Sequence, residues 1–128
     1  MTLNVMLYGA ALSALLAAIL VTLVTLPFRP RRISTVLTAA TSAFLGPVSW
    51  NWVLRSTGAT GAFSHDAPVP PMPISWQDVG SAVTTLALAG VLLGLGPLHA
   101  NANANARRSS VIALLSALAA LLIDVYLY

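Results

Sequence analysis

The stretch LNVMLYGAALSALLAAILVTLVTL, residues 3–26, carries no charged side chain. A helix needs about 20 consecutive apolar residues to cross the hydrocarbon core of a bilayer, and this run supplies them. A cleaved signal peptide places positive charge before its apolar core, whereas the first basic residue here, Arg29, follows the run. We therefore expect residues 3–26 to form a retained membrane-spanning helix.

The composition extends this expectation to the whole chain. Its 128 residues are 58% hydrophobic and only 7% charged, whereas soluble domains carry about 25% charged residues. The length suits a single domain, and the absence of cysteine excludes disulfides and thiolate metal sites. All basic residues are arginine, with no Lys or Glu, and this bias, together with the abundance of Ala, Leu and Val, indicates a bacterial genome of high GC content. The expected location is therefore a bacterial cytoplasmic (inner) membrane, with several apolar segments crossing it.

Three further segments have the length and apolar character of spans. They are residues 33–54, 76–96 and 111–128, separated by an outer loop at 55–75 and an inner loop at 97–110. The predicted fold is an all-α integral membrane protein with four transmembrane helices, N-out and C-out, and one structured, proline-rich extracytoplasmic loop.

The arginines set the predicted orientation. Two clusters flank the first and third connections, which lie on the same side of a four-span protein, and the positive-inside rule makes that side cytoplasmic. Aromatic residues with one polar edge favour the headgroup zone and gather at the opposite level. The predicted topology anchors are Arg29, Arg31, Arg32, Arg107, Arg108, Trp50, Trp52, Tyr126 and Tyr128.

The outer loop is stiff and unusually apolar for a solvated linker. It contains four prolines, which favour extended backbone, and Ser75 with Asp78 forms a capping-box variant that predicts a helix start near Trp76. The loop either folds onto its own helix ends or docks on another protein. The residues predicted to make such contacts are Phe63, Met72, Ile74 and Trp76.

Small residues indicate where helices approach closely. Gly90 and Gly94 form a GxxxG pair, which serves either internal packing or association with another helix. The second span carries hydroxyls at Thr38, Thr41 and Ser42. They either bond back to their own helix or line a transport route.

Two features interrupt the apolar pattern within the spans. Pro47 removes a helical donor from the second span and predicts a kink there. Asp124 lies near the end of the fourth span, where its carboxylate either reaches the headgroups or pairs with a cation such as Arg55.

The sequence contains no recognisable group of residues for catalysis or for metal binding. His65 and Asp66 are the only candidates for a metal site, and one His beside one Asp falls short of the three or four ligands that zinc or copper needs. Adjacent Ser64, His65 and Asp66 cannot converge as a triad. We predict no catalytic residues, no metal and no cofactor, although bound lipid fits the composition.

The expected function is that of a small, non-catalytic accessory subunit in a larger membrane complex of the respiratory or oxygenase type. Its expected partners are membrane lipid and other integral membrane subunits. Nucleic acid is not expected, because the arginines behind the basic pI of about 10.2 are explained as topology signals. A small oligomeric transporter or channel is the alternative, and an outward-facing metal or small-ligand handling protein centred on His65 and Asp66 is the third.

Overall fold

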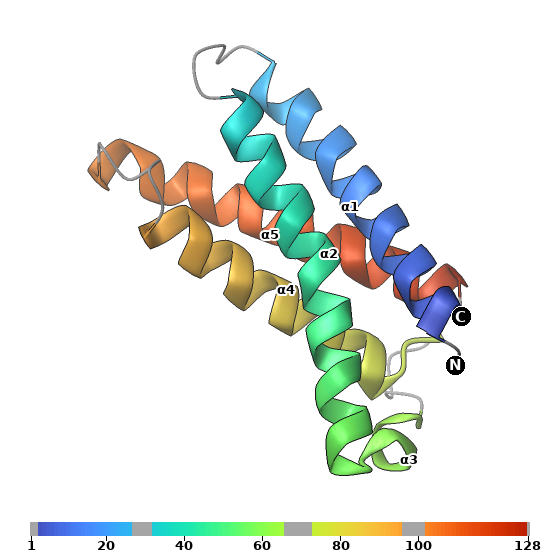
Figure 1. Ribbon diagram of the computed structural model, residues 1–128. Coiled ribbons are helices and arrows are strands. Elements are labelled where there is room, and N and C mark those ends of the chain that lie inside the picture. Colours follow the sequence, from blue (N-terminus) through green and yellow to red (C-terminus); the bar gives the residue numbers. More distant parts are fainter. Residues whose placement is uncertain (1–2, 27–31, 66–72, 96–101, 128) are drawn as a thin grey trace.

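The computed structural model describes residues 3–26, 32–65, 73–95 and 102–127, and nearly all of them are helical (Figure 1). This confirms the all-α prediction. The four long helices and one short turn of helix are α1 (Leu3–Thr25), α2 (Arg32–Thr57), α3 (Thr60–Phe63), α4 (Trp76–Leu95) and α5 (Ala102–Leu127).

Three helices are long and apolar enough to cross a membrane, namely Leu3–Thr25 in α1, Trp76–Gly94 in α4 and Ala106–Leu127 in α5. These spans identify the chain as a membrane protein. Helix α2, with 26 residues, is longer than α1 and α4 and as long as α5. Its hydroxyls, Asn51 and Arg55 make it more polar than the other three. The fourth span therefore stays a prediction.

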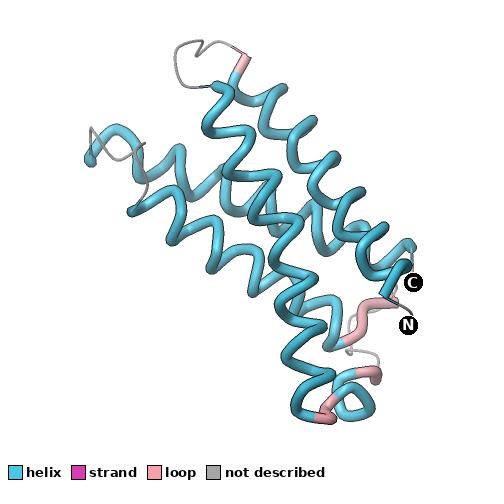
Figure 2. The backbone as a smooth tube through the Cα atoms, in the orientation of Figure 1, coloured by secondary structure: helices cyan, strands magenta, loops and turns pink. Residues whose placement is uncertain are grey.

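The long helices form an antiparallel bundle of two crossed pairs (Figures 1 and 2). Helix α1 packs on α2 and α5, α4 also packs on α2 and α5, and α2 meets α5 across the middle. We call one end the arginine end, where α1 and α4 finish and α2 and α5 begin. The other is the α3 end, where α1 and α4 begin, α5 finishes beside the start of α1, and α2 finishes at α3.

Helix boundaries follow local chemistry. Helix α4 begins at Trp76, as predicted, because Ser75 and Asp78 cap it reciprocally: the Ser75 N–H donates to Asp78 Oδ2 over 2.7 Å and the Asp78 N–H donates to Ser75 Oγ over 3.2 Å. Helix α2 runs through Arg55 to Thr57 rather than ending at Leu54. It is closed by Gly58, whose φ of +68° suits the left-handed conformation after a helix.

Helix α5 begins earlier than the sequence pattern suggested. The alternating Asn–Ala segment, expected to be a flexible inner loop up to residue 110, is helical from Ala102 onward. Alanine has the highest helix propensity and arginine is close behind it, so alternate alanines followed by Arg107 and Arg108 extend the helix beyond the apolar run. The apolar pattern marks the span but not the end of the helix.

Helix α2 contains Pro47 in its interior. Proline has no N–H to donate to the carbonyl four residues earlier, and α2 changes direction near its middle (Figure 1). The bend is in keeping with the kink predicted at Pro47.

Small side chains predominate in the interior of the bundle, beside a few large ones such as Leu54 and Leu93, and many large apolar side chains face outward. The fully buried alanines lie at positions 17, 39, 43, 89, 119 and 120, while large apolar residues such as Leu15, Leu37, Val83 and Leu114 are exposed. Lipid tails are as apolar as leucine, so helices in a membrane associate through close approach of small residues. The burial pattern is that of a bundle made for a lipid environment.

Candidate functional site

Helices α2 and α4 approach each other closely at two glycines, Gly46 and Gly80. A Cβ built on Gly46 would lie 2.7 Å from the Thr85 Cα, a distance that real Cβ atoms do not adopt. The space beside Gly80 of α4 is filled in the same way, because a Cβ built on Gly80 would overlap the indole ring of Trp50. These two glycines let α2 and α4 touch at the centre of the bundle and toward the α3 end.

A polar network joins the same two helices near the α3 end. Gln77 Nε2 of α4 donates to Asn51 Oδ1 of α2 over 2.8 Å. Asn51 Nδ2 in turn donates to the Pro47 carbonyl over 2.9 Å. The buried Asn51 side chain therefore hydrogen-bonds through both its oxygen and its nitrogen. It links the part of α2 that follows Pro47 to the start of α4.

The outer loop, where it is described, folds back onto its own helices. Phe63 packs edge-on against Trp50 with ring centroids 5.4 Å apart. The Trp76 N–H donates to the His65 carbonyl over 3.2 Å, and Ile74 is buried. Of the predicted contact residues in this loop, Trp76 stays 49% exposed, and Met72 lies outside the described residues.

Asp124 of α5 is only 6% exposed. Its carboxyl lies against Ser81 of α4 and within electrostatic reach of Asp78. The Ser81 hydroxyl and Trp50 Nε1 are nevertheless buried without a partner of regular hydrogen-bond geometry among the described residues. The side chain points into the bundle rather than to the headgroups, and its pairing with Arg55 stays a prediction.

The hydroxyls of α2 do not form one continuous stripe. Thr38 Oγ1 donates to the Ser34 carbonyl and Ser42 Oγ to the Thr38 carbonyl, each over 2.8 Å. Ser42 is buried, whereas Thr41 is exposed on another face. The first of the two sequence interpretations, local bonding within the helix, describes Thr38 and Ser42.

The metal candidates do not converge in the described part of the chain. His65 is exposed at the end of the segment that follows α3, and the described residues contain no group of three His, Cys, Asp or Glu that could hold a metal ion. Asp66, the other candidate, lies outside the described residues.

The topology anchors divide between the two ends. Arg107 is exposed and Arg108 is half-buried in the first turns of α5, at the arginine end. Trp52 and Tyr126 are 71% and 73% exposed near the α3 end, while Trp50 packs inward. The structure does not describe Arg29, Arg31, Tyr128 or the side chain of Arg32.

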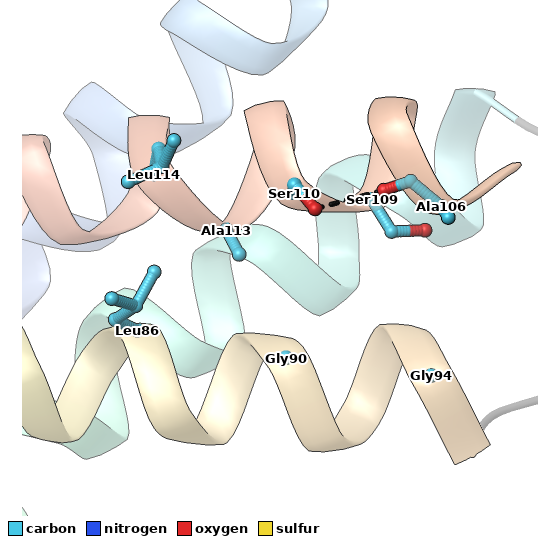
Figure 3. A pocket seen from close by; sticks show the side chains of 8 residues that line it. All are labelled: Leu86, Gly90, Gly94, Ala106, Ser109, Ser110, Ala113 and Leu114. Atoms are coloured by element: carbon cyan, nitrogen blue, oxygen red, sulfur yellow. Dashed lines mark hydrogen bonds between the residues drawn. The ribbon is translucent and has the colours of Figure 1, made fainter.

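The GxxxG pair of α4 faces a hollow. No atom of the residues that the structure describes lies within 4 Å of a Cβ built on Gly90 or Gly94. A groove of about 490 Å³ runs between α4 and α5 over these glycines (Figure 3). It is lined by Leu86, Gly90, Gly94, Ala106, Ser109, Ser110, Ala113 and Leu114.

Sequence reasoning missed Gly46 and Gly80, the two glycines that close the bundle. Neither belongs to a GxxxG pair: Gly46 has Ser42 four residues before it and Gly80 has Thr84 four residues after it, and each glycine meets a residue on the facing helix. Comparison with models of protein families, with curated proteins and with solved structures finds no match for this chain. Its residues and their arrangement therefore carry the functional argument.

Proposed function

We propose that this chain is a four-span, non-catalytic accessory subunit of a larger membrane complex, of the respiratory or oxygenase type, in a bacterial cytoplasmic membrane. The observation that carries the proposal is the closed interior. Alanine and serine side chains fill the space between the helices, and α2 and α4 touch at Gly46 and Thr85. Such an interior suits a packing module better than a conduit.

The position of α2 supports its crossing of the membrane as a fourth span. At 1.5 Å per residue its 26 residues extend about 39 Å, more than the roughly 30 Å of a hydrocarbon core. It packs along α1 and α4, and Thr38 and Ser42 bond within the helix. Polar groups that are already bonded cost less to place in lipid.

The distribution of charge supports the orientation. Arg107 and Arg108 lie at the arginine end, whereas Asp78 and Asp124 lie toward the α3 end. Under the positive-inside rule the arginine end faces the cytoplasm. Both chain ends, together with α3, then face outward.

Trp76 is the candidate contact for a partner subunit. It is 49% exposed where the loop enters α4. By contrast, Phe63 packs against Trp50 and Ile74 is buried within this chain, so neither is available to a partner. Tryptophan is enriched among the residues that dominate protein interfaces. We assign the more exposed Trp52 to the headgroup zone.

The test is gentle extraction from the native host, followed by size analysis and mass spectrometry of the co-purifying chains. We expect a complex of fixed stoichiometry with other integral membrane subunits, weakened by Trp76→Ala and retained by the matched control Trp52→Ala. Migration alone would contradict the proposal. A homo-oligomer would favour the transporter alternative, to be tested by substrate flux in Thr38→Val and Thr41→Val variants.

A further inference from the structure

The groove between α4 and α5 has an apolar part and a polar part (Figure 3). Leu86 and Leu114 face each other at the end near the middle of the bundle, and Gly90 and Gly94 form its floor. Ser109 and Ser110 lie at the other end, where α5 begins. A volume of about 490 Å³ falls within the range of about 300–1,000 Å³ that ligand sites occupy.

Positive charge stands at the polar part of this groove. Arg107 directly follows the lining residue Ala106 and is exposed. It precedes Leu114 by seven residues, or about two turns, and so lies on the same side of α5. Of the acidic residues that the structure describes, Asp78 lies in the first turn of α4 and Asp124 in the last turn of α5, so both are at the α3 end, away from Ser109. An anion at the groove mouth therefore meets the Arg107 guanidinium and the Ser109 hydroxyl, with no carboxylate of the described residues beside it.

We infer that the α4–α5 groove binds one anionic phospholipid. The acyl chain lies over Gly90 and Gly94 between Leu86 and Leu114, and the phosphate lies at Arg107 with the hydroxyl of Ser109. Ser110 Oγ donates to the Ala106 carbonyl over 2.9 Å, so the proton of this hydroxyl is used within the helix, and Ser109 is the serine that donates to the phosphate. The site is independent of whether the chain serves as an accessory subunit.

Charge favours a lipid over a second copy of this chain. A parallel twofold dimer through the glycine face would place equivalent residues at the same membrane depth, so Arg107 would approach its counterpart. Like charges across an interface are unfavourable. A phospholipid brings a compensating phosphate and a chain that fills an apolar groove.

The experiment measures lipid binding to the purified full-length chain by native mass spectrometry. Phosphatidylglycerol and phosphatidylcholine with identical acyl chains are titrated separately. We expect one phosphatidylglycerol to bind with preference over phosphatidylcholine. Arg107→Gln should reduce that preference about fivefold, the equivalent of about 1 kcal/mol for one arginine near the membrane surface.

Two matched controls distinguish lipid bound in the groove from lipid bound elsewhere on the surface of the protein. Gly94→Leu should abolish the bound lipid by filling the floor, whereas Ala87→Leu, at an exposed position of α4 that does not line the groove, should leave it. Arg55→Gln should not alter the lipid preference. Equal binding of both lipids in wild type and Arg107→Gln would overturn the inference, and so would a dimer that Gly94→Leu dissociates. If Gly94→Leu fails to fold, the lipid titrations of Arg107→Gln still test whether the groove binds an anionic phospholipid.

Discussion

The two halves of α4 use glycine in opposite ways. Toward the α3 end, Gly80 lies under the Trp50 ring, and Gly46 of α2 presses against Thr85 at the centre. Toward the arginine end, Gly90 and Gly94 form the floor of a groove, and no described residue comes within 4 Å of a Cβ built on either of them. One half of the helix is closed by its neighbour, and the other half is open.

The difference shows that a GxxxG spacing along one helix does not tell which glycines contact a neighbouring helix. Gly90 and Gly94 form a GxxxG pair, the spacing of a helix-association motif, yet they face the hollow, whereas Gly46 and Gly80, which belong to no GxxxG pair, lie at the close contacts. Whether a glycine makes a close contact depends on the residue that lies opposite it on the facing helix. Thr85 and Trp50 reach across to fill the closed half, while the groove-lining residue of α5 nearest the arginine end is Ala106.

The largest expected effect comes from Gly46→Ala. The added methyl would lie 2.7 Å from the Thr85 Cα, and because backbone cannot give way as a side chain can, we expect a loss of about 3 kcal/mol from overpacking. The measurement is reversible unfolding in mixed micelles. Gly90→Ala is the matched control, and it should be neutral or stabilise by up to about 1 kcal/mol through helix propensity. Equal losses at both positions would erase the distinction between the two halves.

Gly80→Ala should cost less, about 1–2 kcal/mol, since the obstacle is the Trp50 side chain rather than backbone. Its control on the open half is Gly94→Ala. In the background of Trp50→Leu the cost of Gly80→Ala should largely disappear, and a double-mutant cycle of unfolding free energies measures this coupling. Additive losses would show that the indole ring is not the obstacle.

A smaller effect is expected from Gln77→Leu, which removes the hydrogen bond to Asn51 between α4 and α2. Polar contacts between membrane helices average about 0.6 kcal/mol and reach about 1.7. We expect a loss of about 1 kcal/mol in the same unfolding assay, because Asn51 is buried and loses a partner. A stabilised variant would show that this network does not hold the closed half together.

The smallest effect is expected from Thr38→Val. Its hydroxyl bonds only to the Ser34 carbonyl of its own helix, so unfolding should change by less than about 0.5 kcal/mol. Ser34→Ala, a neighbour on the same helix, serves as the control for generic changes at this end of α2. A loss of more than 1 kcal/mol would instead mark Thr38 as a contact between helices.

Much of the fold could be predicted from the sequence because apolar runs and caps are local signals. The helical class, the spans in α1, α4 and α5 and the start of α4 at Trp76 follow from such signals. The earlier start of α5 at Ala102 was missed because helix propensity continues where hydrophobicity stops.

The candidate sites were harder to predict because they depend on which helices face each other. The pairings Gly46–Thr85, Trp50–Phe63 and Gln77–Asn51 join residues with no shared motif, so spacing along one helix cannot reveal them. The inward position of Asp124 against Ser81 has the same origin. A polar residue near a span end is equally compatible with headgroups and with a neighbouring helix.

The central claim is a four-span bundle whose closed half faces outward and whose open half faces the cytoplasm. The chain has no cysteine, so single engineered cysteines report unambiguously. In intact cells a membrane-impermeant maleimide should label Ser64→Cys beside α3, and should label Ile33→Cys at the start of α2 and Ala102→Cys at the start of α5 only after permeabilisation. If α2 does not cross, Ile33→Cys and Ser64→Cys lie on the same side of the membrane and are labelled together or protected together, and either pattern would contradict the account.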